Sequence, residues 1–233
     1  LRKKGFEGKF SDSSRCAGPH KNYRDAVKLL IKEGYHVVGI METEHEAFSD
    51  IEGYFPMSLI EQKSSILDKK LLSVFFLIKC SLFIGQQSGP YSLPVHSGIP
   101  CLICDASSYR ATTYDPHNLI IFKHYVVEET GKRLSDVEIY TKHQELAFGY
   151  NFTEKGIRME PCTPEEIVEG VKETLARMRG KLRLSKEDEL LCKKYYELPP
   201  KNMNSYYQRN RPPLAVLRRM KDELLSMKKG SVN

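Results

Sequence analysis

Apolar residues along this chain alternate between helical stripes and short uninterrupted runs. The segment 22–34 carries its apolar residues on one helical stripe and ends in glycine, which predicts a helix. The β-branched run YHVVGIM (35–41) follows at once and predicts a buried strand. A helix expected over 67–79 then leads to two more apolar runs, 81–85 and 99–105, which predict further strands. Helices alternating with short apolar strands are typical of α/β proteins, so we expect a doubly wound parallel sheet.

The second half of the chain contains the clearest helix signal. In CTPEEIVEGVKETLARMRG (162–180), Thr163 is a predicted N-cap and Pro164 the first helical residue, while Glu166 completes a capping box and Gly180 follows the end. This combination predicts a helix whose apolar stripe packs on the core.

Four other segments give softer predictions. A helix capped by Ser135 is expected over 133–146, and the stretch 118–126 is apolar with one charge inside it. Residues 42–65 are mixed and polar, which indicates a loop with short elements. After a break rich in proline and asparagine, LAVLRRMKDELLSM (214–227) predicts a basic helix that packs back on the body.

Length and composition fit a globular protein with one main domain. The chain has 233 residues, 40% hydrophobic and 28% charged, and no stretch approaches the ~18 consecutive apolar residues that span a bilayer. We expect residues 1–180 to form the main α/β domain. Residues 181–233 would form a C-terminal helical extension.

The formal net charge is +6, and the basic residues concentrate at the two ends of the chain. A surplus of this size is typical of a solvated surface, so we do not expect a nucleic acid polymer as partner. Contact with an anionic membrane surface and binding of a small phosphorylated ligand both fit the charge. They stay open as alternatives.

The cysteines do not show the paired spacing of a zinc site. Cys101 and Cys104 form a CxxC pair within a predicted strand, where positions i and i+3 point to opposite faces. This placement argues against a shared metal or a disulfide between them. Buried free thiols in a reducing cytoplasm are the expected state.

The loop between the second and third predicted strands carries the candidate chemistry. In FIGQQSGPYSLPVHSGIPCLICD (83–105), Ser88 and Gly89 follow an apolar strand and precede a short helix opened by Pro90. Backbone N–H groups and the serine hydroxyl in such a loop can face a phosphate without a metal. Small residues after a strand also serve tight turns, and neither a Walker motif nor GxGxxG occurs.

The order of these segments resembles a family of bacterial glycosyltransferases from surface-polysaccharide clusters, which have a GT-B-like fold. The resemblance covers nearly the whole chain, and its most specific part is FIGxxSGxxxxPxxxGxP from Phe83 to Pro100. Softer matches are LRKKGF, NYRDAVKLLIKEGYHVV, IIFKHYV, RLSDVEI, GIRMEPCTPEEI and the closing basic helix.

The resemblance implies that the chain is the donor-binding half of such an enzyme, with a nucleotide-sugar as donor. Residues 1–180 would then be a Rossmann-like nucleotide-sugar-binding domain that lacks its first strand. It assigns eight positions to the donor: the phosphate loop Gly85, Ser88, Gly89 and Pro94, the phosphate-binding cations Arg2 and Arg15, and the nucleotide- or sugar-binding residues Lys123 and Glu138. Guanidinium groups suit phosphate oxygens physically. The alternative for the charged positions is an ordinary solvated side chain. For Lys123, the alternative is a side chain whose ammonium group extends to solvent from the end of a strand.

Two features depart from the family pattern. The family places an arginine and a glycine just after the strand that here reads YHVVGIM, where this chain has Gly39, Ile40 and Met41. In the family pattern, the first strand of the donor domain comes before the residues that match LRKKGF. This chain has no apolar run in that place. We therefore expect that strand, and an acceptor domain before it, to be missing or degenerate.

The implied reaction is metal-independent transfer of a sugar from the nucleotide donor to a hydroxyl of a surface glycan, with no cofactor. It would take place in the cytoplasm or at the inner face of the membrane. The general base is expected from the other domain, so no catalytic residue is assigned, although His96 near the loop merits a test. One alternative is a nucleotide-sugar epimerase, for which Asp105 is the one suitably placed carboxylate. The other is a non-catalytic module that binds a glycan or a partner protein.

Overall fold

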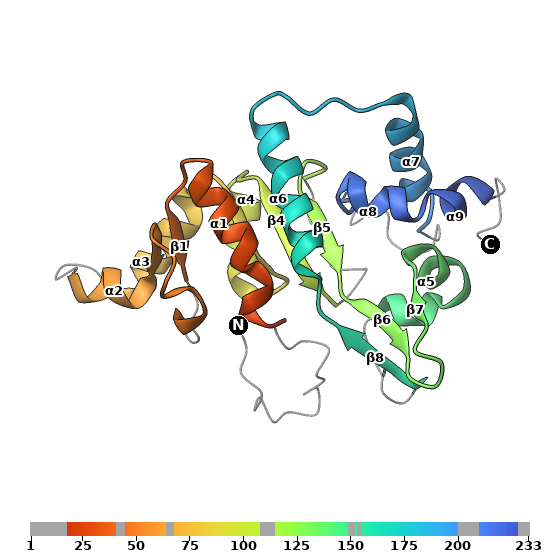
Figure 1. The fold of residues 1–233 in the computed structure, drawn as a ribbon, viewed down its shortest axis with the longest axis horizontal. Helices are drawn as coiled ribbons and strands as arrows, with labels where there is room; N and C mark the ends of the chain where they lie inside the picture. Colours follow the sequence, from red (N-terminus) through yellow and green to blue (C-terminus); the bar gives the residue numbers. More distant parts are fainter. Residues whose placement is uncertain are drawn as a thin grey trace.

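The computed structural model describes residues 18–40, 45–63, 68–107, 115–148, 152, 155–199 and 210–227. Within these ranges the strands form two parallel sheets and one antiparallel sheet (Figure 1). The parallel sheets are β1–β2 and β3–β4–β5, and the antiparallel sheet has the order β7–β6–β8. Their bounds are β1 Val37–Gly39, β2 Tyr54–Pro56, β3 Phe83–Gln86, β4 Cys101–Ala106, β5 Leu119–Phe122, β6 His124–Val127, β7 Arg133–Leu134 and β8 Ile157–Glu160.

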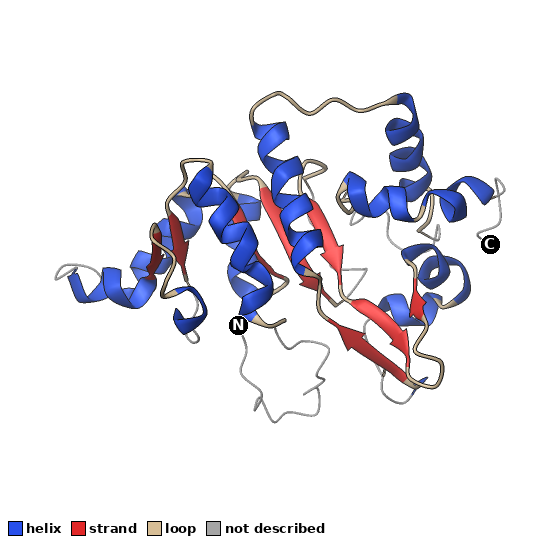
Figure 2. Cartoon of the chain, in the orientation of Figure 1, coloured by secondary structure: helices blue, strands red, loops and turns tan. Residues whose placement is uncertain are grey.

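Helices surround these strands (Figure 2). The α-helices are α1 Arg24–Lys32, α2 Met57–Lys63, α3 Lys69–Lys79, α4 Ser92–His96, α5 Asp136–Lys142, α6 Pro164–Met178, α7 Lys186–Tyr196, α8 Leu214–Arg219 and α9 Lys221–Ser226. Short 3-10 turns are η2 His20–Tyr23, η3 His45–Phe48, η4 Gly89–Tyr91 and η5 Gln144–Phe148. The chain is thus α/β with parallel strands, as the alternating pattern predicts.

Both faces of the β3–β4–β5 sheet are covered by apolar packing. On one face, Leu102 and Cys104 of β4 pack with side chains of α1 and α6, which lie side by side in Figure 1. On the other face, Cys101 and Ile103 belong to a second cluster that includes side chains of α3, α5, α7 and α8. The alternation along β4 follows from the two-residue period of a strand, and it confirms that Cys101 and Cys104 point to opposite faces.

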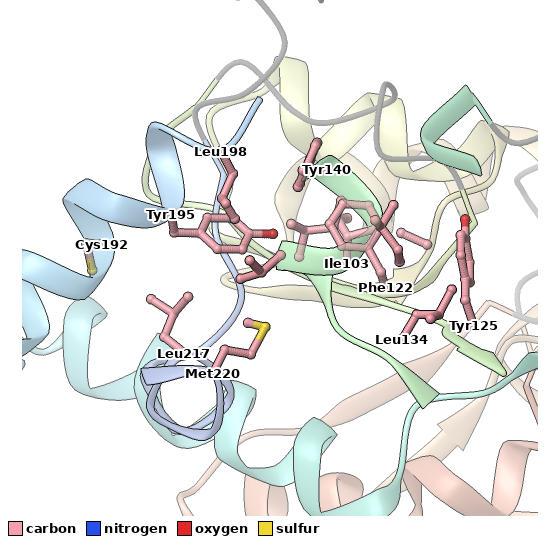
Figure 3. Close-up of a cluster of buried hydrophobic side chains, with 14 of the residues drawn as sticks. Ile103, Phe122, Tyr125, Leu134, Tyr140, Cys192, Tyr195, Leu198, Leu217 and Met220 are labelled. Carbon is pink, nitrogen blue, oxygen red and sulfur yellow. The ribbon is translucent and has the colours of Figure 1, made fainter. Parts of the chain in front are cut away.

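The C-terminal segment contributes to this second cluster. Figure 3 shows Tyr195 and Leu217 directed toward the same core as Ile103 and Phe122. Tyr195 also donates a hydrogen bond from its hydroxyl to Oδ2 of Asp136, 2.8 Å away, which joins α7 to α5. The helices after residue 180 therefore share a core with the sheet.

The helix starts agree closely with the sequence. Thr163 and Ser135 each accept a hydrogen bond from the backbone N–H three residues on, and both capping boxes are complete. Three stretches differ from the prediction. Of residues 133–146, expected as one helix, Arg133–Leu134 form β7 and only Asp136–Lys142 form the helix α5, which is followed by the turn η5. The apolar segment 118–126 divides at Lys123 into β5 and β6, which belong to different sheets, and the single helix predicted over 214–227 is two short helices joined at Met220.

Candidate functional site

The loop after β3 lies at the carboxyl end of the parallel strands. Ser88 has extended backbone angles and precedes η4, and its hydroxyl does not cap that turn. Its carbonyl accepts a hydrogen bond from the N–H of Tyr91, 3.1 Å away. Gly89 is exposed, and a Cβ added there would meet no atom of the described chain within 4 Å. A ligand can therefore approach the main chain of this loop.

A pocket of about 180 Å³ opens beside this loop. Gly85, Gln86 and Ser88 line it from the β3 side, and most of the remaining lining is apolar. The opposite wall of the pocket is formed by residues of α1, by the end of β1 and by Phe48 and Tyr54. The carboxyl edge of β3 is thus open to a concave, largely apolar space.

Asp105, near the end of β4, accepts three hydrogen bonds at this edge. Its Oδ2 accepts hydrogen bonds from the Tyr23 hydroxyl (2.8 Å) and from Nε2 of Gln86 (3.1 Å), while its Oδ1 accepts one from the Cys162 N–H (2.7 Å). The residue is buried and has a left-handed φ of 52°. Aspartate is among the few residues with a side chain that tolerate this region.

The bonding of Asp105 determines the shape of the loop entrance. Burial, together with the nearby Cys104 and Asp105, raises the pKa of Tyr23 well above its ordinary value, so its hydroxyl keeps the proton that it donates. Gln86, held by the same carboxylate, lies two residues before Ser88. A second bond joins the two strand ends, from the N–H of Ser107 to Oε1 of Gln87 at 3.3 Å. These contacts fix the start of the Ser88–Gly89 loop.

The residues assigned from the sequence are only partly brought together. Gly85 and Ser88 line the pocket, with Gly89 next along the chain, whereas Pro94 is buried within α4. Lys123 is buried at the end of β5, where its N–H bonds to the Ala106 carbonyl at 2.9 Å. It thus lies at the carboxyl edge of the same sheet but not in the pocket lining.

The remaining assignments lie elsewhere. Glu138 is in the first turn of α5, where Oε2 accepts a hydrogen bond from the Ser135 N–H at 3.2 Å and Oε1 pairs with Lys132. It caps a helix and does not line the pocket. Arg2 and Arg15 fall outside the described residues, so their assignment stays a prediction. His96 is exposed, and its Nδ1 lies 2.7 Å from the Ser92 carbonyl within its own helix.

The sequence did not reveal the partners of Asp105. In the sequence, Tyr23 lies within the helical stripe predicted over 22–34, and Cys162 directly precedes the predicted N-cap Thr163. They come from segments 82 and 57 residues away from Asp105. The only available signal was Gln86, which stands between the FIG strand and the Ser-Gly pair and therefore belongs to the same edge.

A second charged centre surrounds Glu166, whose side chain is fully buried. Its Oε2 lies 2.7 Å from Nε2 of His124, and its Oε1 bonds to guanidinium nitrogens of Arg133 and Arg219, both at 3.0 Å. Burial by itself would raise the pKa of Glu166. The bond and charge of His124, with the bonds from Thr163 and Arg133, lower it to about 2. This carboxylate joins α6 to β6, β7 and α8.

Within the described ranges, no group of three or more His, Cys, Asp or Glu residues could hold a metal ion. No helix of the described chain is both long and apolar enough for a membrane span. Comparisons with protein-family models, with curated proteins and with solved structures gave no match.

Proposed function

We propose that this chain is the donor-binding unit of a glycosyltransferase, with a doubly wound, Rossmann-like arrangement of the GT-B type. The observation that carries the proposal is the exposed Ser88–Gly89 loop at the carboxyl end of β3, beside a pocket. In open parallel sheets, ligands bind beyond the carboxyl ends of the strands. The resemblance of the FIGxxSG segment to nucleotide-sugar enzymes supplies the ligand class.

The ligand contacts in this proposal come mainly from the main chain. In this proposal the N–H of Gly89 and the hydroxyl of Ser88 would donate hydrogen bonds to a diphosphate. The cations Arg2 and Arg15 would offset its negative charge and would stabilise the nucleoside diphosphate as it leaves, in the role that a metal fills in other enzymes. The sugar then passes to a hydroxyl of a surface glycan.

The bonding of Asp105 favours transfer over epimerisation. Epimerisation needs a carboxylate or another group free to exchange a proton with the sugar. Both oxygens of Asp105 accept hydrogen bonds from Tyr23, Gln86 and Cys162, which suits a structural role at the site's edge. The general base for transfer is proposed to come from the acceptor domain.

A second candidate is a related unit that binds without catalysing transfer. Among the described residues that line the pocket there is no lysine or arginine. Gly39 and Ile40, two uncharged residues of the pocket lining, stand where the resembling family has a cation after the strand. This candidate would recognise a glycan or a protein partner at the same edge.

Titration calorimetry with a panel of nucleoside diphosphates tests the proposal. We expect the nucleoside diphosphate of one base to bind. Gly89→Ala should weaken this binding on the order of tenfold, about 1.4 kcal/mol, because the added methyl group would occupy space next to the main chain that the ligand approaches. Fold should be unaffected, since that methyl meets no other atom within 4 Å. Ser97→Ala, at an exposed serine beyond α4, is the matched control and should bind as the wild type does.

Three results separate the alternatives. Binding that Gly89→Ala weakens and Ser97→Ala does not supports the donor site. An absence of binding by every nucleotide at millimolar concentration refutes it and favours the non-catalytic candidate. Turnover of a nucleotide-sugar without an acceptor indicates epimerase or hydrolase chemistry instead.

A further inference from the structure

The helix α3 carries apolar side chains on two of its faces. Leu72 and Leu77 are buried, and Leu77 packs in the cluster on the Ile103 face of the β3–β4–β5 sheet. The α3 stripe, on the other face, is a set of four exposed apolar residues: Leu71 (59% exposed), Val74 (38%), Phe75 (51%) and Ile78 (38%). A helix that is apolar on all sides is typically buried on all sides. The outer face of α3 therefore calls for a cover.

The spacing of the α3 stripe is that of a helix-packing seam. Its members stand at positions i, i+3, i+4 and i+7, which are neighbours on a helix surface. The helix α2 contacts α3 and leaves half of Leu59 exposed. Figure 1 shows both helices at one end of the molecule, away from α7, α8 and α9. Single exposed apolar residues are common on soluble proteins, whereas a contiguous stripe marks an interaction surface.

The area of this surface is sufficient for a dimer. Aromatic side chains bury about 150–250 Å² and aliphatic ones somewhat less, so the α3 stripe and Leu59 expose roughly 400 Å² per copy. Homodimer interfaces have an apolar share of about 65%, so this apolar core corresponds to an interface of roughly 600 Å² per copy, or roughly 1,200 Å² in all. A specific interface should exceed about 1,000 Å².

We infer that the α3 stripe is the interface of a homodimer, in which α3 packs antiparallel against α3 of a second copy. Twofold symmetry places the same surface on both sides of such an interface. An antiparallel pair centred between Val74 and Phe75 brings Leu71 of one copy toward Ile78 of the other, so that all four side chains are covered. The inference goes beyond the proposed sugar transfer and does not depend on it.

The composition of the stripe favours a second copy over a lipid surface. Helices that lie in a membrane interface combine an apolar face with a strongly basic one, whereas the opposite face of α3 is buried through Leu72 and Leu77. Trp and Tyr, which are enriched at the level of the lipid headgroups, are absent from the stripe. Among protein interfaces, those of permanent homodimers are the more apolar.

Sedimentation velocity of the full chain measures this association. We expect the wild type to form dimers at concentrations on the order of 10 μM. Phe75→Glu places a charge at the centre of the interface and should raise the dissociation constant about a hundredfold or more. The matched control is Leu190→Glu, because Leu190 is exposed to a similar extent (44%) on α7, at the other end of the molecule. It should sediment as the wild type does, and circular dichroism should show both variants folded.

Disulfide cross-linking tests where the interface lies. Val74→Cys stands next to the expected twofold axis, so two copies should become linked to each other under mild oxidation. Cys80, which is partly exposed just after α3, sets the background that is measured in the wild type. Leu190→Cys should not exceed this background. Cross-linking of Val74→Cys that stays at the background would place the contact elsewhere and would overturn the inference.

Two sedimentation results would also overturn it. One is a wild-type chain that stays monomeric up to concentrations on the order of 1 mM. The other is a dimer that Phe75→Glu and Leu190→Glu leave equally stable. Flotation with vesicles that contain phosphatidylglycerol tests the lipid alternative. A monomer that floats with these vesicles, and that Phe75→Glu releases from them, would show that the stripe binds a lipid surface and not a second copy.

Discussion

Replacing Glu166 by glutamine tests how the antiparallel sheet is attached to the helices around it. The carboxylate is fully buried and contacts His124 of β6, Arg133 of β7 and Arg219 of α8 while it caps α6. Glutamine keeps the shape and one acceptor oxygen. It removes the charge and presents an NH₂ group to side chains that are themselves donors.

The expected loss follows from the pKa of Glu166, which lies at about 2 in the fold against an ordinary value of 4.5. A pKa lower by roughly 2.5 corresponds to about 3 kcal/mol in favour of the charged form. We therefore expect Glu166→Gln to lower the free energy of unfolding by about 3 kcal/mol at pH 7. This agrees with the 3–5 kcal/mol that removal of one partner from a buried ion pair typically costs.

The same pKa predicts how the loss depends on pH. Between about pH 4.5 and 2 the unfolded chain binds a proton at Glu166 that the folded chain does not, so acid removes this stabilisation. The contribution is complete above pH 4.5 and absent below pH 2. The difference between wild type and Glu166→Gln should accordingly shrink steadily as the pH falls through this window.

Urea unfolding followed by circular dichroism at pH 7, 4 and 3 measures this difference. Glu165→Gln is the matched control, because Glu165 is the exposed neighbour in the same helical turn and should change stability by less than about 0.5 kcal/mol. A Glu166→Gln variant as stable as this control would refute the reasoning. So would a stability difference that stays constant from pH 7 to pH 3.

Two further substitutions test the packing of α6. Glu173→Gln should destabilise the chain by about 3 kcal/mol in urea unfolding, because Glu173 pairs with the buried Arg211 (2.6 Å) and accepts the N–H of Leu214 (2.6 Å); a loss below 1 kcal/mol would contradict this. Gly170→Ala should lower the melting temperature despite the better helix propensity of alanine, since its Cβ would lie 2.8 Å from both methyl carbons of the buried Leu102. A higher melting temperature would show that Leu102 moves aside.

Local chemistry explains why the helix starts could be predicted. Ser135 and Thr163 cap helices through residues only three positions away, so the signal is complete within a few letters of sequence. The division of 118–126 could not be seen in the same way. Lys123 ends β5 and its N–H bonds to Ala106, whereas the next residue pairs with Glu160 in another sheet. Such a change of partner depends on distant strands.

The same distinction applies to the candidate site. The Ser88–Gly89 loop was visible because small residues directly follow an apolar run. The sequence shows Asp105 at the end of a predicted strand, but it does not show that this carboxylate holds the start of the loop. Its partners Tyr23 and Cys162 have no mutual spacing that a sequence pattern could express. Contacts over such distances along the chain follow from the fold, so the sequence could suggest the loop but not its support.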